Sequence, residues 1–235
     1  MEAKIFSNTI LIGTAQLYIT DESMGIISGE FLPAENYYSF VQKAVWEHFF
    51  SAKPCYDQWL SLNINAQLSN GYFLYAAGGY DFEDSPDFPD ESFYINIAGV
   101  DRHVLEDFFL EPEPRPFVVE PWESIDIGQK FAFEDELRKE IGLQSSNNSF
   151  LSFVKPSKNE HILTDFEFSA LCHRGGNDDV LFKIIKRGFD KSFAIVHLTW
   201  VDRDENSNYP KVSFYSDFDD FKYSRMYPDK AEWEY

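Results

Sequence analysis

The spacing of the hydrophobic residues changes at Pro33, and this change limits the folds open to the chain. Before Pro33, the segments Lys4–Thr20 and Met24–Leu32 are rich in isoleucine, leucine and threonine and flank a short polar turn. This pattern is typical of two strands joined in a hairpin. Beyond Pro33, apolar residues from Tyr37 to Phe49 recur at steps of three and four. That spacing predicts a helix with one apolar face, which would lie across the sheet.

Further strand patterns follow this helix. Apolar and polar residues alternate from Trp59 to Leu68, and the dipeptide Asn70-Gly71 favours a tight hairpin leading into a return strand at 72–77. We expect the tract 80–91, rich in aspartate and proline, to be a loop. The remaining patterns predict a strand at 93–98, helices at 101–109, 130–141 and 217–225, and strands or short helices at 150–154, 162–172, 180–185, 193–200 and 211–215.

These elements predict an α+β fold class, with mostly antiparallel sheets and a few packed helices in two units. The chain of 235 residues is longer than most single domains, and its 44% hydrophobic residues supply enough material for packed cores. The polar stretch 144–149 lacks periodicity and is suited to a linker. We therefore expect an acidic α+β domain at 1–143, a linker at 144–149 and a smaller α+β domain at 150–235.

Negative charge is concentrated in one part of the chain. The formal net charge is −20, and fourteen acidic residues between Asp81 and Asp126 face only Arg102 and Arg115, a net −12. Residues 1–143 carry eight basic and twenty-five acidic residues, whereas 144–235 carry twelve and fifteen. A field of this sign repels nucleic acid and anionic membranes and attracts a basic partner. The sequence therefore predicts a surface that binds a basic protein.

Aromatic residues are interleaved with these acidic residues, as in interfaces that combine aromatic anchors with a charged rim. We expect Phe82, Phe88 and Trp122 to be exposed, and the proline-rich stretch 111–116 to form an exposed extended arm. The candidate partner-binding residues are Asp81, Phe82, Glu83, Asp84, Asp87, Phe88, Asp90, Glu91, Glu111, Glu113 and Trp122.

Motifs for catalysis, metals and phosphate do not fit the chain. The carboxylates at 81–90 lack the ligand spacing of an EF-hand, and the histidines and cysteines match no zinc motif. A nucleophile elbow and a phosphate-binding glycine loop are also missing. We predict no catalytic residue, metal or cofactor. The alternative hypothesis is an enzyme with an unfamiliar site around His173, Arg174, Asp178 and His197.

The amino terminus lacks the basic start and apolar stretch of a secretory signal, and no run of about eighteen apolar residues occurs. Two cysteines are too few for a disulfide framework. We therefore expect a cytoplasmic protein with free thiols.

Several stretches resemble patterns from an uncharacterised bacterial protein family: Ile10–Gly13, Met24–Phe31, Asn177–Phe182 and Val196–Trp200. The acidic, aromatic-rich character is similar to that of immunity proteins that neutralise bacterial toxins. This resemblance implies a cognate toxin as the basic partner, and many such toxins are nucleases; no catalytic residues can be transferred from it. A secretion adaptor or chaperone for an effector is a further alternative.

Overall fold

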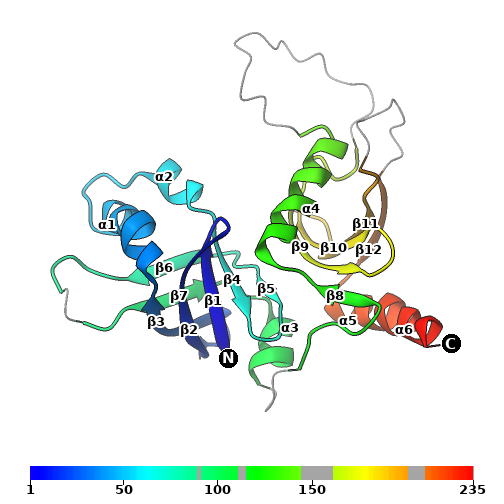
Figure 1. Cartoon of the computed structure of the whole chain (residues 1–235), viewed down its shortest axis with the longest axis horizontal. Coiled ribbons are helices and arrows are strands. Elements are labelled where there is room, and N and C mark those ends of the chain that lie inside the picture. The colour runs from blue at the N-terminus through cyan, green and yellow to red at the C-terminus, as the bar shows by residue number, and fades with distance from the viewer. Residues whose placement is uncertain (89–90, 111–114, 144–160, 201–209, 235) are drawn as a thin grey trace, which may run out of the picture. The chain divides into compact units, whose positions relative to one another are not determined.

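The computed structural model describes residues 1–88, 91–110, 115–143, 161–200 and 210–234, and it divides into two compact units (Figure 1). Unit 1 is Met1–Phe117 and unit 2 is Val118–Tyr235. This division falls earlier than the predicted linker at 144–149, which lies outside the described residues. The helix expected at 130–141 packs in unit 2, against that unit's sheet. Periodicity identifies such a helix but not the sheet it will cover, because the contacts are distant in sequence.

A seven-stranded antiparallel sheet forms unit 1, in the order β5-β4-β1-β2-β3-β7-β6. Its strands are β1 (Glu2–Ser7), β2 (Ile10–Asp21), β3 (Ile26–Pro33), β4 (Ile64–Leu68), β5 (Phe73–Leu74), β6 (Gly79–Glu83) and β7 (Tyr94–Ala98). The sheets of the two units and the short helices around them make this the α+β fold that the sequence predicts.

Two segments of unit 1 differ from their predicted form. The first predicted strand is broken at Asn8, whose φ of 51° lies in the left-handed region that asparagine tolerates. The predicted loop at 80–91 begins instead as strand β6, because Tyr80 to Glu83 alternate between the two faces of the sheet.

The sheet of unit 1 is curled. Its edge strands β5 and β6 are joined by residues 75–78 alone. The path from Leu74 to Gly79 spans at most about 18 Å, whereas the outer strands of a flat seven-stranded sheet lie about 29 Å apart. The hydroxyl of Tyr80 in β6 donates a hydrogen bond to the carbonyl oxygen of Leu74 in β5, at 3.2 Å. The edges therefore approach each other, and the concave face holds the core.

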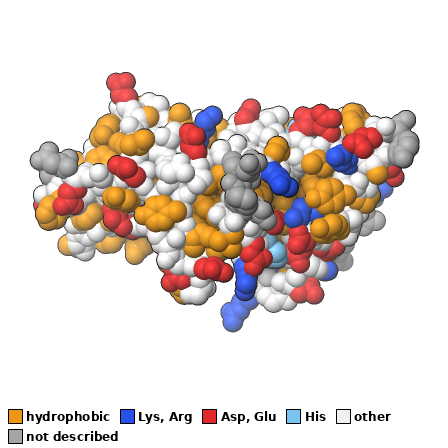
Figure 2. Space-filling model, turned by 90° about the horizontal axis from the view of Figure 1, so that it is seen from below, with side chains coloured by type: hydrophobic (Ala, Val, Ile, Leu, Met, Phe, Trp, Pro, Cys, Tyr) orange, Lys and Arg blue, Asp and Glu red, His pale blue; other side chains and the backbone are white. Residues whose placement is uncertain are grey.

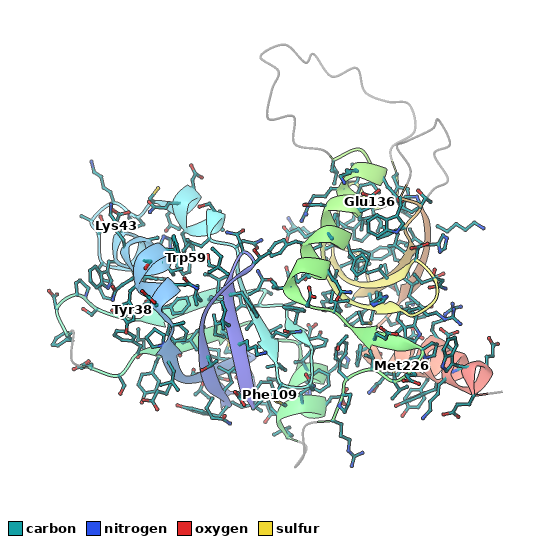
Figure 3. The ribbon with its side chains drawn as sticks, in the orientation of Figure 1. Tyr38, Lys43, Trp59, Phe109, Glu136 and Met226 are labelled. Atoms are coloured by element: carbon teal, nitrogen blue, oxygen red, sulfur yellow. The ribbon has the colours of Figure 1, made fainter. Side chains whose placement is uncertain are left out.

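Short helices cover this concave face. The π-helical turn η1 (Tyr37–Val41) and helix α1 (Gln42–Phe49) bury Tyr37, whose ring centroid lies 5.1 Å from that of Phe31 in β3. In helix α2 (Tyr56–Ser61), Trp59 lies between α1 and the sheet, with ring centroids 5.0 Å from Phe49 and 6.2 Å from Phe82 (Figure 3). The prediction of a strand from Trp59 is wrong for its first half, because this packing favours a helical turn before β4.

The last helical segment of unit 1 comprises α3 (Arg102–Val104) and the π-helical turn η2 (Leu105–Phe109). Phe108 of η2 packs against Tyr72, with ring centroids 5.1 Å apart. This segment agrees with the helix predicted at 101–109.

Unit 2 contains a five-stranded antiparallel sheet in the order β12-β11-β10-β9-β8. Its elements are β8 (Trp122–Ser124), α4 (Ile127–Glu140), β9 (Glu167–Arg174), β10 (Asp179–Ile185), β11 (Phe193–His197), β12 (Lys211–Tyr215), α5 (Phe218–Phe221), η3 (Lys222–Met226) and α6 (Tyr227–Trp233). Both faces of the central strands are covered: Phe133 of α4 contacts His173 on one face, and Phe218 of α5 contacts Phe193 on the other. Strands covered on both sides read as continuous apolar runs, as β11 does.

Candidate partner-binding site

Alternation along β6 sends acidic and aromatic side chains to opposite faces of the unit 1 sheet. Asp81 and Glu83 lie on the outer face, where the side-chain amide of Asn96 donates to both, at 3.4 and 2.8 Å. Phe82 faces the core and is only 1% exposed, with its ring centroid 5.2 Å from that of Phe31. The prediction that Phe82 is exposed is therefore wrong, because the strand's two-residue period turns its ring inward.

Asp84 follows β6 and is 2% exposed. Its Oδ2 accepts hydrogen bonds from the Tyr37 hydroxyl at 2.7 Å and from Gln42 Nε2 at 3.0 Å, and its Oδ1 accepts one from the indole N–H of Trp46 at 3.1 Å. Burial, aided by this carboxylate, raises the pKa of Tyr37 well above its ordinary value. Asp84 is therefore not on an exposed binding surface as predicted: its carboxylate ties η1 and α1 to the end of β6.

A pocket of about 640 Å³ opens between the end of α1 and the β6–β7 hairpin, and four of the eight acidic candidates line it. Twelve residues line it, and none of these described residues is a lysine, arginine or histidine. Four are carboxylates and six are aromatic: Asp81, Glu83, Asp84 and Glu91, with Phe49, Phe50, Phe82, Phe88, Phe93 and Tyr94. Six of the predicted partner-binding residues thus line one cavity: Asp81, Phe82, Glu83, Asp84, Phe88 and Glu91.

The end of α1 strengthens the negative field of this pocket. Phe49 is the last residue of α1 and Phe50 is its C-cap, and both line the pocket. The free carbonyl groups at a helix C-terminus act as about half a negative charge. The local field in the pocket therefore favours a cation. On the face of the molecule seen in Figure 2, acidic and hydrophobic side chains are interspersed.

The remaining predicted partner-binding residues near this hairpin differ in their exposure. Phe88 is 58% exposed, which confirms the prediction for this residue, and Glu91 is also exposed. Asp87 is exposed in the same loop, although it does not belong to the pocket lining. Three candidates, Asp90, Glu111 and Glu113, lie outside the described residues.

Trp122 belongs to unit 2 and is 2% exposed. Its Nε1 donates to Asp229 Oδ2 at 2.9 Å, and its ring centroid lies 5.0 Å from that of Phe221. The prediction that Trp122 is exposed is wrong, because β8 directs this ring into the core beneath the C-terminal helices. Trp122 is therefore removed from the candidate interface.

Four aromatic residues that line the pocket are absent from the predicted partner-binding residues: Phe49, Phe50, Phe93 and Tyr94. One signal was present: Phe50 directly follows the last periodic residue of α1, so its ring falls outside the buried stripe, and it is 47% exposed. Phe93 and Tyr94 are among the aromatic residues interleaved with the acidic stretch, but their place in the pocket depends on strand pairing.

The alternative site in unit 2 does not assemble as predicted. His173 and Arg174 are neighbours on β9 and face opposite sides of the sheet: His173 contacts Phe133 of α4, whereas Arg174 Nε lies 3.3 Å from Asp229 Oδ2 of α6. His197 Nδ1 pairs with Asp179 Oδ1 at 2.8 Å on the side of the C-terminal helices. Asp178 instead accepts a hydrogen bond from Trp200 Nε1 at 3.0 Å. The four residues therefore do not converge on one cavity.

Within the described ranges, no group of three or more histidine, cysteine, aspartate or glutamate side chains is arranged to hold a metal ion. None of the helices described is both long and apolar enough to cross a membrane.

Fold and site together define an α+β protein with an anionic, aromatic-lined pocket on a curled antiparallel sheet. Comparisons with protein families, curated proteins and solved structures found no match to the chain.

Proposed function

We propose that this protein binds a basic protein through the acidic surface of unit 1. The pocket between α1 and the β6–β7 hairpin carries the proposal, because four carboxylates and a helix C-terminus border it and no basic residue is found among the described residues of its lining. Arg102, one of two basic residues in the acidic stretch, is already held by Glu106 at 2.6 Å. Unbalanced negative charge of this kind accelerates encounter with a positive surface.

The partner we favour is a bacterial toxin domain, and binding would block its activity. Nuclease domains have basic active sites because they bind phosphate, and carboxylates can occupy such a surface in place of phosphate groups. Glu83 and Glu91 are exposed and able to make such contacts. The proposal includes the cytoplasmic location expected from the sequence.

The test begins with capture of the partner at low salt and its identification by mass spectrometry. We then expect the association rate of the purified pair to fall steeply as salt is raised, since screening weakens steering. The double variant Asp87→Lys/Glu91→Lys should slow association by about tenfold at low salt. The matched variant Asp190→Lys/Glu232→Lys changes two exposed carboxylates of unit 2 by the same charge. Equal rates for the two variants, or association insensitive to salt, would contradict the proposal.

A second candidate function is that of a secretion adaptor or chaperone. The helices of unit 1 expose large apolar side chains beyond the pocket, including Phe40 at 60%, Tyr56 at 64% and Leu60 at 71%. Exposed apolar surface of this kind often marks a protein-binding face. An activity assay of the captured partner separates the two functions: an inhibitor abolishes the partner's activity, whereas an adaptor binds and leaves it unchanged.

A further inference from the structure

We propose that the pocket between α1 and the β6–β7 hairpin binds the side chain of an arginine from the basic partner. This inference rests on the proposed function and specifies which group the pocket recognises. It follows from the pocket's charge, from the shape of its aromatic side chains and from its volume.

The charge of the pocket calls for a cation. Asp84 at its base is hydrogen-bonded by Tyr37, Gln42 and Trp46, which are all neutral groups. These bonds satisfy the carboxylate oxygens without adding a compensating positive charge. Asp81 and Glu83 likewise receive their hydrogen bonds from a neutral amide, that of Asn96. An entering guanidinium would supply the missing positive charge.

The aromatic rings favour arginine over lysine. Phe88, Phe50 and Tyr94 line the pocket and are 58%, 47% and 37% exposed, so their rings are accessible to a ligand. A guanidinium is planar, stacks on aromatic faces and is less strongly hydrated than an ammonium. It also presents several N–H donors in a fixed fork that can engage two carboxylates at once. Lysine offers only a compact, strongly hydrated charge.

The volume agrees with this occupant. A cavity of about 640 Å³ lies within the range of ligand pockets and is larger than one guanidinium requires. An arginine side chain would therefore enter together with part of its own backbone, which leaves the surrounding rim for flanking contacts. Each such contact adds to the specificity of the partner.

The experiment titrates the full chain with N-acetyl-arginine amide and follows the backbone amides by NMR. The matched probes are N-acetyl-citrulline amide, which has the same shape without the charge, and N-acetyl-lysine amide. We expect the arginine probe to shift the amide resonances of four residues that line the pocket: Phe50, Ser85, Phe88 and Tyr94. Its affinity should be at least about threefold higher than that of the lysine probe, a difference that corresponds to about one cation–π contact. Citrulline should leave these resonances unchanged.

Variants with matched controls locate the binding. Glu91→Gln and Phe88→Ala should each weaken arginine binding by about threefold or more. The controls Asp190→Asn and Tyr223→Ala remove an exposed carboxylate and an exposed ring of unit 2, outside the lining, and should have no effect. Two results would overturn the arginine site. One is that citrulline binds as tightly as arginine, and the other is that the controls weaken arginine binding as much as Glu91→Gln and Phe88→Ala do. If salt-dependent association with the basic partner persisted in that case, the proposed function would still stand.

Discussion

At the scale of single residues, buried carboxylates join segments that lie far apart in the chain. Asp84 accepts hydrogen bonds from three side chains about forty positions earlier in unit 1. In unit 2, Glu134 Oε1 of α4 accepts the backbone N–H of Ala170 in β9 at 3.0 Å, so a carboxylate occupies a hydrogen-bonding position at the strand's edge. A buried carboxylate is stable only where donors surround it, which makes such residues sensitive to substitution.

Asp84→Asn should lower the free energy of unfolding by about 2 kcal/mol, because an amide nitrogen cannot accept the hydrogen bonds that one carboxylate oxygen receives now. Urea denaturation measures the change. The control Asp87→Asn alters an exposed carboxylate three residues away and should change stability by less than about 0.5 kcal/mol. An Asp84→Asn protein as stable as the wild type would show that these contacts contribute little.

We expect unit 2 to lose stability in acid as the carboxylate of Asp220 becomes protonated. Its carboxylate accepts the backbone N–H of Ser216 at 2.8 Å and the hydroxyl of Ser224 at 2.9 Å, and these hydrogen bonds lower its pKa. A pKa lowered by folding contributes stability above the unfolded value of about 3.9, and that stability is lost as the pH falls through the folded value. Asp220→Asn should therefore be less stable than wild type at pH 7, with the difference shrinking below about pH 4. Urea denaturation across this range, with Asp190→Asn as control, measures it; a constant difference would refute this assignment.

At the scale of elements, helix α4 shows how polar residues replace an apolar stripe. Its buried side includes Lys130 and Glu134, which form an ion pair, as well as Leu137. At its end, Glu140 Oε1 accepts hydrogen bonds from the backbone N–H of Trp200 at 2.8 Å and the hydroxyl of Thr199 at 2.9 Å. Directed polar contacts therefore attach the helix to the rest of unit 2, from Glu134 near its middle to β9 and from Glu140 at its end to the residues after β11.

The N-terminus of α4 is closed by a capping box: Asp126 Oδ1 accepts the Gln129 N–H at 2.8 Å, and Gln129 Oε1 accepts the Asp126 N–H at 2.9 Å. Asp126→Ala should lower the free energy of unfolding by about 1 kcal/mol. Asp135→Ala, at an exposed site of the same helix, is the control and should have a smaller effect. Equal losses in thermal or urea denaturation would mean that the cap is not what stabilises this end.

At the scale of the whole molecule, the two units differ in what their charges do. The exposed carboxylates of the pocket in unit 1 lack basic partners in its lining. In unit 2, Asp179 and Asp229 lie between arginines and a histidine: Arg225 NH2 is 3.2 Å from Asp179 and Arg225 Nε is 3.0 Å from Asp229. The exposed carboxylates of the pocket thus leave this surface of unit 1 negative, whereas these two in unit 2 hold the C-terminal helices to the sheet.

Asp229 connects the first strand of unit 2 with its last helix, through Trp122 in β8 and Arg174 in β9. The Nε atoms of Arg174 and Arg225 lie near Asp229 without aligned hydrogen bonds, so the attraction is mainly between charges. Asp229→Asn should lower the free energy of unfolding by about 2 kcal/mol, since it leaves two partly buried arginines less compensated. Denaturation of Asp219→Asn, which changes an exposed carboxylate, is the control. A loss no greater than the control's would contradict this role.

Much of the fold followed from local pattern. The period change at Pro33, the hairpin between β2 and β3 and the apolar run of β11 are visible in sequence because the backbone's geometry dictates where side chains point. The same reasoning could not separate Phe82 from Phe88. Both are phenylalanines among carboxylates, yet one is 1% and the other 58% exposed, because only one lies within a strand that packs on a core.

The fold class and the excess of negative charge before and within the 81–126 stretch can be read from the order of the residues, because periodicity and charge are properties of neighbouring residues. Which carboxylates are exposed, the contact of Phe49 and Phe50 with the pocket at the β6–β7 hairpin, and the pairing of Arg174 with Asp229 of α6 became visible only in the folded chain. Those outcomes depend on strand order and curvature, which arise from contacts between residues far apart in the chain.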